Sequence, residues 1–69
     1  MWKVYKYNGH YIQGDLIGKH KTKSAAMKKA SKEIDFTYAV EDFSKDEKII
    51  WLDAYDHTPV GVVVGKAAS

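Results

Sequence analysis

The residue types of the N-terminal segment predict a β-hairpin. Residues 2–7 are rich in aromatic and β-branched types, Asn8-Gly9 follows at once, and residues 10–13 form a second such run. Asn-Gly between two runs of this kind favours a two-residue turn, because that turn needs positive φ at both central positions. The expected cross-strand partners are Tyr7 with His10, Tyr5 with Ile12, and Lys3 with Gly14. Neither face of this hairpin is cleanly polar, so the pattern leaves open which face is buried.

Beyond the hairpin, the pattern changes from strand to helix. Leu16 and Ile17 extend the second strand until Gly18 ends it, and the polar residues 19–23 are typical of a loop. Residues 24–34 are good helix formers, with Thr22 or Ser24 as the N-cap. An apolar stripe at helical spacing contains Ala26, Met27, Ala30 and Ile34, and the opposite face carries Lys28, Lys29 and Lys32. The small alanines allow this helix to approach a sheet closely.

Three more strands are expected, over residues 36–43, 48–55 and 60–64, and residues 65–69 resemble a frayed tail. Short connections favour antiparallel neighbours. The predicted fold is therefore α+β, a single antiparallel sheet in β-β-α-β-β-β order with one helix packed on one face. The residues expected to be prominent in its core are Met27, Ala30, Ile34, Phe36, Val40, Ile50 and Leu52. Residues 60–64 are expected at a sheet edge, where self-association is a further possibility.

Length and composition narrow the class of protein. A chain of 69 residues with 45% hydrophobic content supports one domain, residues 1–69, with a modest core. It has no cysteine, its longest apolar stretch falls far short of the ~20 residues that span a bilayer, and its start does not resemble a signal peptide. We expect a cytoplasmic protein with no membrane partner, and the sequence slightly favours a monomer.

The charge is distributed unevenly along the chain. Residues 1–32 hold eight lysines and one acid, a net charge of +7, whereas residues 33–69 hold three lysines and eight acids, a net charge of −5. This asymmetry indicates one basic and one acidic surface, with the basic surface facing an anionic partner. All eleven cations are lysine. Because lysine lacks the planar fork of arginine, any nucleic-acid contact is expected to address the backbone with weak sequence specificity.

Catalytic and metal-binding patterns are weak. His10, His20 and His57 occupy separate turns or loops without the paired spacing of a metal site. The acidic run over residues 42–53 lacks the glycine of a calcium loop and fits a charged hairpin turn better. The chain contains no phosphate-binding or nucleophile motif and has little room for a lined cleft. We expect no enzyme activity, no cofactor and no metal.

The strongest signal is a basic patch with interleaved aromatic residues. The expected partner-binding residues are Lys3, Tyr5, Lys6, Tyr7 and Tyr11 of the hairpin, together with Lys19, Lys21, Lys23, Lys28, Lys29 and Lys32. An equally weighted interpretation makes the tyrosines core residues and the lysines a solvated surface. On the first interpretation, the six lysines from 19 to 32 form one continuous surface without an acid among them. Changing Lys28, Lys29 and Lys32 to glutamate then preserves the fold and abolishes function, whereas reversing Glu41, Asp42 and Glu47 matters less.

Two stretches of the chain resemble a known group of proteins. The run TKSAAMKKASKEI over residues 22–34, and Trp51-Leu52 followed by Tyr55, are similar to the helix and a later strand of small type I anti-CRISPR proteins. This resemblance implies a phage-encoded inhibitor that occupies the nucleic-acid-binding surface of a host defence complex. The implied partner is a host protein or ribonucleoprotein. The alternative from the residues alone is a general module that binds DNA or RNA through lysines and aromatics.

Overall fold

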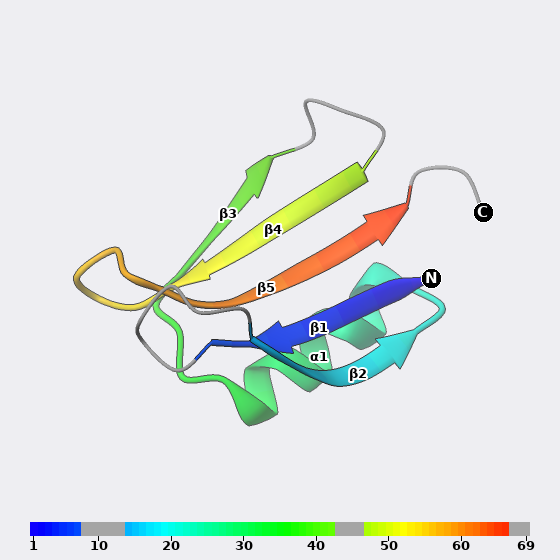
Figure 1. The fold of residues 1–69 in the computed structure, drawn as a ribbon, viewed down its shortest axis with the longest axis horizontal. Coiled ribbons are helices and arrows are strands. Elements are labelled where there is room, and N and C mark those ends of the chain that lie inside the picture. The colour runs from blue at the N-terminus through cyan, green and yellow to red at the C-terminus, as the bar shows by residue number, and fades with distance from the viewer. Residues whose placement is uncertain (8–13, 43–46, 67–69) are drawn as a thin grey trace.

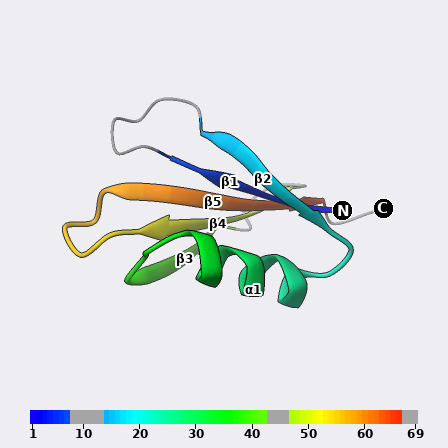
Figure 2. The same cartoon turned by 90° about the horizontal axis from the view of Figure 1, so that it is seen from below.

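The computed structural model describes residues 1–7, 14–42 and 47–66, which form a five-stranded antiparallel sheet and one helix (Figure 1). The elements are β1 (Trp2–Lys6), β2 (Asp15–His20), α1 (Lys23–Glu33), β3 (Tyr38–Asp42), β4 (Glu47–Asp53) and β5 (Pro59–Lys66). The strand order across the sheet is β2-β1-β5-β4-β3. Figure 2 shows α1 on one side of the sheet. The predicted α+β class and its β-β-α-β-β-β order are confirmed.

The helix approaches the sheet through its alanines, as its sequence indicates. It begins after Thr22, whose hydroxyl accepts a hydrogen bond from the Ala25 backbone N–H at 3.2 Å, so Thr22 and not Ser24 is the N-cap. Ala26 and Ala30 are completely buried. α1 packs against β1, β2 and β5, which form one side of the sheet and its middle. The remaining strands, β3 and β4, extend past the helix.

The core lies between α1 and the strands beneath it. Of the expected core residues, Ala30, Ile34, Ile50 and Leu52 are buried, and Met27 and Phe36 are partly buried against them. Val40 was expected in the core, and this is wrong, because 49% of it is exposed on β3. The core instead contains Val4 and Val63, which are directly opposite each other on β1 and β5.

Two glycines of β5 let side chains lie flat on the sheet. A Cβ at Gly61 would lie 2.6 Å from Ile34 Cδ1, and a Cβ at Gly65 would collide with the indole ring of Trp2. Gly65 is the cross-strand partner of Trp2. Glycine is therefore required at both positions for the close approach of a larger neighbour.

The hairpin forms in a different register from the expected one. Tyr5 lies opposite Leu16 and Lys3 lies opposite Lys19, with a register shift between Val4 and Tyr5. The expected pairs of Tyr5 with Ile12 and Lys3 with Gly14 are therefore wrong, and the pair of Tyr7 with His10 lies outside the described residues.

Gly18 was also expected to end the second strand, and this is wrong. It lies inside β2, so Lys19 and His20 belong to a strand and not to the expected loop. A Cβ at Gly18 would lie 2.8 Å from His20 Nε2 and 3.3 Å from Lys29 Cγ. A larger residue at this position, opposite Val4, would therefore displace the His20 side chain.

The strand that contains the valine run is central. β5 lies between β1 and β4 and is hydrogen-bonded to both, so the expected edge position of residues 60–64 is wrong. Consecutive apolar residues suit a central strand whose side chains are buried on both faces, which Val62 and Val63 illustrate, since both are buried. β5 also continues to Lys66, two residues into the expected tail. The edges of the sheet are β2 and β3, and self-association through residues 60–64 is excluded because both sides of β5 are paired.

Candidate functional site: the open face of the sheet

Side chains on the strands alternate between two faces, and the cross-strand partners show which residues share a face. We call the face that carries α1 the covered face and the opposite face the open face. One set of partners crosses all five strands on the open face: Leu16, Tyr5, Val62, Trp51 and Val40. We call this set the apolar row. It has no charged member and runs from one edge of the sheet to the other.

The apolar row is most buried at its centre and most exposed at its two ends. Val62 at its centre is 5% exposed, whereas Leu16 and Val40 at the two edges are 45% and 49% exposed. Tyr5 and Trp51 are partly buried on either side of Val62. The rings of Tyr7 and Trp51 are tilted against each other with centroids 6.2 Å apart, so Tyr7 adds aromatic surface beside the centre of the row.

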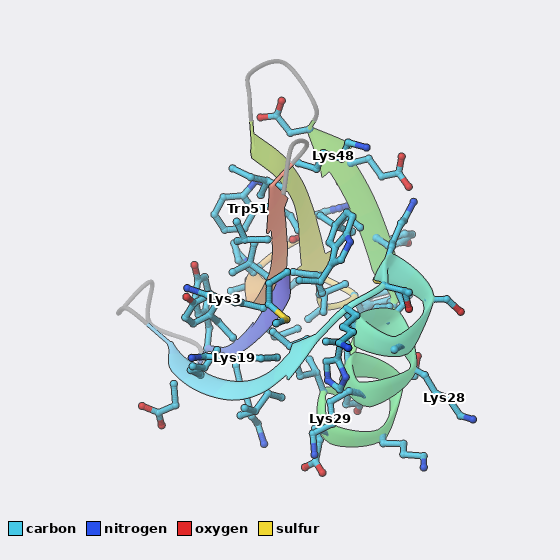
Figure 3. The ribbon with its side chains drawn as sticks, turned by 90° about the vertical axis from the view of Figure 1, so that its right-hand side faces the viewer. Lys3, Lys19, Lys28, Lys29, Lys48 and Trp51 are labelled. Carbon is cyan, nitrogen blue, oxygen red and sulfur yellow. The ribbon has the colours of Figure 1, made fainter. Side chains whose placement is uncertain are left out.

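Charged residues border the apolar row. The next set of cross-strand partners contains Lys19, Lys3, Val64, Ile49 and Asp42. Figure 3 shows Lys3, Lys19 and Trp51 on the side of the sheet away from α1. On the other flank, Asp53 shares this face with its partner Tyr38. The open face thus has lysines at the β2 end, aspartates toward β3, and an apolar centre.

The lysines of the helical region lie on the other side of the molecule. Lys28 and Lys32 are exposed one turn apart on α1, and Lys21 is exposed just before the helix. We call these three residues the cationic helix surface. Lys28 and Lys29 lie on the helix side of the sheet in Figure 3.

The expected continuous surface of six lysines without an acid is wrong. Lys23 Nζ lies 2.9 Å from Glu41 Oε1 on β3, and Lys29 Nζ lies 3.2 Å from Glu33 Oε1 on the same helix. Lys19 belongs to the open face. A cation in the first turn, such as Lys23, opposes the helix dipole, and the carboxylate of Glu41 offsets its charge.

The expected partner-binding residues therefore divide between two faces. The open face has Lys3, Tyr5, Tyr7 and Lys19, the covered face has Lys6, the helix has Lys23, Lys28, Lys29 and Lys32, and Lys21 lies in the connection between β2 and α1. Tyr11 lies outside the described residues. Sequence reasoning missed Trp51, Val40 and Leu16 as site residues. The signal that could have found Trp51 is the alternation of residues 48–55, which puts Ile49 and Trp51 on the same face of a strand.

A turn between β4 and β5 carries a separate aromatic cluster. The rings of Tyr38 and His57 stack with centroids 5.0 Å apart and an interplanar angle of 14°, and Tyr55 is 81% exposed. His57 adopts a positive φ of 65° in this turn. The Thr58 hydroxyl and the Thr58 backbone N–H both donate hydrogen bonds to the Asp56 carboxylate. These bonds, the hydroxyl's first, hold the pKa of the Asp56 carboxyl below its usual range.

Candidate sites for chemistry are sparse in the part of the chain that the structure describes. Within residues 1–7, 14–42 and 47–66, no three histidine, aspartate or glutamate side chains gather closely enough to hold a metal ion. An open depression beside the end of α1 is lined by Ser31, Lys32, Glu33, Ile34, Asp35 and Phe36. In the same described residues, no helix combines the length and apolar character needed to cross a membrane.

We compared the chain with known proteins. Protein-family models, curated proteins and solved structures all give no match. The geometry of the open face and of the cationic helix surface is therefore the basis for a functional proposal.

Proposed function

We propose that this chain is a non-catalytic binding protein that docks the open face of its sheet onto a partner protein. The observation that carries the proposal is the apolar row, which crosses all five strands and ends in exposed Leu16 and Val40. Exposed contiguous apolar surface bordered by charge is typical of protein interfaces. Tyr5, Tyr7 and Trp51 are also of the residue types that dominate binding energy at such interfaces.

The charge of the open face favours a protein partner over nucleic acid. Lys3 and Lys19 on this face are matched in number by Asp42 and Asp53. Binding of a phosphate backbone depends on an excess of cations that displace counterions. A balanced face with an apolar centre lacks that excess, so a protein surface with its own apolar patch fits better.

The cationic helix surface adds a long-range contribution. Its three lysines are exposed and carry positive charge, which attracts phosphate groups to this part of the molecule while the open face contacts protein. A complex that handles nucleic acid presents both protein and phosphate. Because two stretches of the chain resemble type I anti-CRISPR proteins, we further propose that the partner is a host ribonucleoprotein that handles nucleic acid. The chain would block the binding of nucleic acid by this complex.

The experiment that tests docking compares two variants with the same change in charge. Leu16→Asp places a carboxylate in the apolar row, whereas Tyr55→Asp changes an even more exposed apolar side chain outside it. Immobilised wild-type protein and both variants are exposed to host lysate and to a purified type I CRISPR effector complex. We expect Leu16→Asp to weaken capture of the bound protein about tenfold or more, and Tyr55→Asp to leave it near wild type. Full capture by Leu16→Asp would contradict docking through the open face.

A second candidate function rests on the cationic helix surface. Lys21, Lys28 and Lys32 are exposed on the helix side, and lysines in this arrangement can contact the phosphates of DNA or RNA without reading bases. Titration of labelled DNA or RNA with the purified chain alone separates the candidates. Salt-dependent binding supports phosphate contacts by the cationic helix surface, whereas no binding at physiological salt together with capture of a protein supports docking through the open face.

A further inference from the structure

The two edges of the sheet are protected to very different degrees. The β2 edge carries a register shift in its pairing with β1, contains Gly18 and Lys19, and is backed by α1. Each of these features discourages a further strand from pairing there. The β3 edge (Tyr38–Asp42) has no glycine and no lysine, its register with β4 is unbroken, and all five of its residues are exposed. Its charged residues are Glu41 and Asp42 at one end, and the apolar and neutral residues 38–40 precede them.

We propose that β3 pairs with β3 of a second copy of this chain, antiparallel and about a two-fold axis at Val40. An edge strand presents alternate N–H and C=O groups that its single neighbour does not use, and these groups are a template for another strand. A second copy of the same strand satisfies both edges at once, as a two-fold interface requires. The inference is independent of the partner proposed for the open face.

The sequence of β3 selects the register of this pairing. Centring on Val40 places Val40 against its counterpart, Tyr38 against Asp42 of the second copy, and Ala39 against Glu41 of the second copy. All five residues of the strand are then paired and no acid faces an acid. Centring on Glu41 would oppose two glutamates, which is unfavourable. Centring on Ala39 would pair only three of the strand's five residues.

Each face of the joined sheet accommodates this register. On the open face, the Tyr38 hydroxyl can donate to the Asp42 carboxylate of the second copy, and the stack with His57 limits where the Tyr38 ring can lie. On the covered face, the small Ala39 of the second copy lies opposite Glu41 and leaves room for the Lys23–Glu41 ion pair. The exposed Val40 side chains meet at the axis, so two apolar rows become one that crosses ten strands.

The absence of cysteine makes the register directly testable. Residues directly opposite in an antiparallel pair have Cα atoms about 4.5–5.5 Å apart, which suits a disulfide. Val40→Cys should therefore form a disulfide-linked dimer in a glutathione redox buffer. Glu41→Cys should not, because in this register its symmetry mate lies two residues further along the strand, beyond about 7 Å. We expect at least about tenfold more linked dimer for Val40→Cys than for Glu41→Cys or for Leu16→Cys on the opposite edge.

A measurement without cross-linking completes the test. Sedimentation of the purified wild-type chain should show a mass that rises from monomer to dimer with concentration. Val40→Lys places two cations at the axis and should leave only monomer, whereas Leu16→Lys, with the same charge change at a similarly exposed position, should dimerise like wild type. A monomeric wild type at every concentration, or equal cross-linking of all three cysteine variants, would overturn the proposal. Both measurements use the purified chain alone, so their outcomes do not depend on whether the open face docks onto a partner.

Discussion

The two faces of the sheet are built from alternate residues of the same strands, yet they exclude water in opposite ways. On the covered face, Ala26 and Ala30 on the helix and Gly61 and Gly65 on β5 let the helix, Trp2 and the large core side chains approach the sheet closely. The open face has no helix over it, and the aromatic Tyr5 and Trp51 flank the buried Val62. In the part of the chain that the structure describes, the helix packs on the covered face alone. The open face therefore stays accessible to a partner, although Val62 at its centre is only 5% exposed.

The largest expected effect is on stability, which a substitution on the covered face should lower far more than one on the open face. Ala30→Gln inserts a polar side chain beneath the helix and should lower the free energy of unfolding by about 3 kcal/mol, through overpacking and an unpaired amide. Leu16→Gln, at the exposed end of the apolar row, should change it by less than about 0.5 kcal/mol. Chemical denaturation monitored by circular dichroism measures both. Equal losses would mean that the open face is as closely packed as the covered one.

A smaller effect concerns the charge on each side. Changing Lys21, Lys28 and Lys32 to glutamine should reduce the slope of log affinity against log salt for duplex DNA by up to about three, because about one unit is lost per phosphate contact. Changing Lys3 and Lys19 on the open face should leave the slope nearly unchanged, since aspartates on that face offset their charge. Fluorescence titration of labelled DNA at several salt concentrations gives the slopes. The reverse outcome would assign phosphate contacts to the open face.

The smallest effect tests the ion pair that joins the helix to the edge of the sheet. Glu41→Gln removes the carboxylate beside Lys23, and both side chains are about half exposed, with 44% and 50% of their surfaces accessible. Such pairs contribute about 0.2–1 kcal/mol, and salt screens them. We expect a loss of stability in this range at low salt that shrinks at high salt. A loss of several kcal/mol would show that β3 depends on the helix for its position.

Local sequence determined the types of the elements, but the register depended on contacts that are distant in sequence. The helix over residues 23–33 and the apolar stripe that contains Ala26 and Ala30 followed from spacing and residue type. The register of β1 with β2 did not, because the pairing shifts between Val4 and Tyr5, and residue type does not mark this irregularity. Val40 alternates like a core residue, but its strand lies at the edge of the sheet and its side chain shares the open face with Trp51.

Several residues of the candidate site were named from the sequence, but the face of the sheet on which each one lies was not. Sequence reasoning found Lys3, Tyr5 and Tyr7, which do share the open face. It also grouped Lys19 with Lys23, although the chain turns from β2 into α1 between them and places them on opposite sides of the sheet. Position along the chain cannot reveal this division, since the crossing from one side to the other depends on where the helix packs.

The two tryptophans of the chain stand on different faces. Trp2 lies over Gly65 on the covered face, and Trp51 belongs to the apolar row on the open face. Indole emission shifts to shorter wavelength when water leaves the ring, so each face carries its own intrinsic fluorophore. With Trp2 replaced by phenylalanine, the emission of Trp51 reports events on the open face. With Trp51 replaced instead, the emission of Trp2 follows the closure of the helix over the sheet, and docking becomes optically distinct from folding.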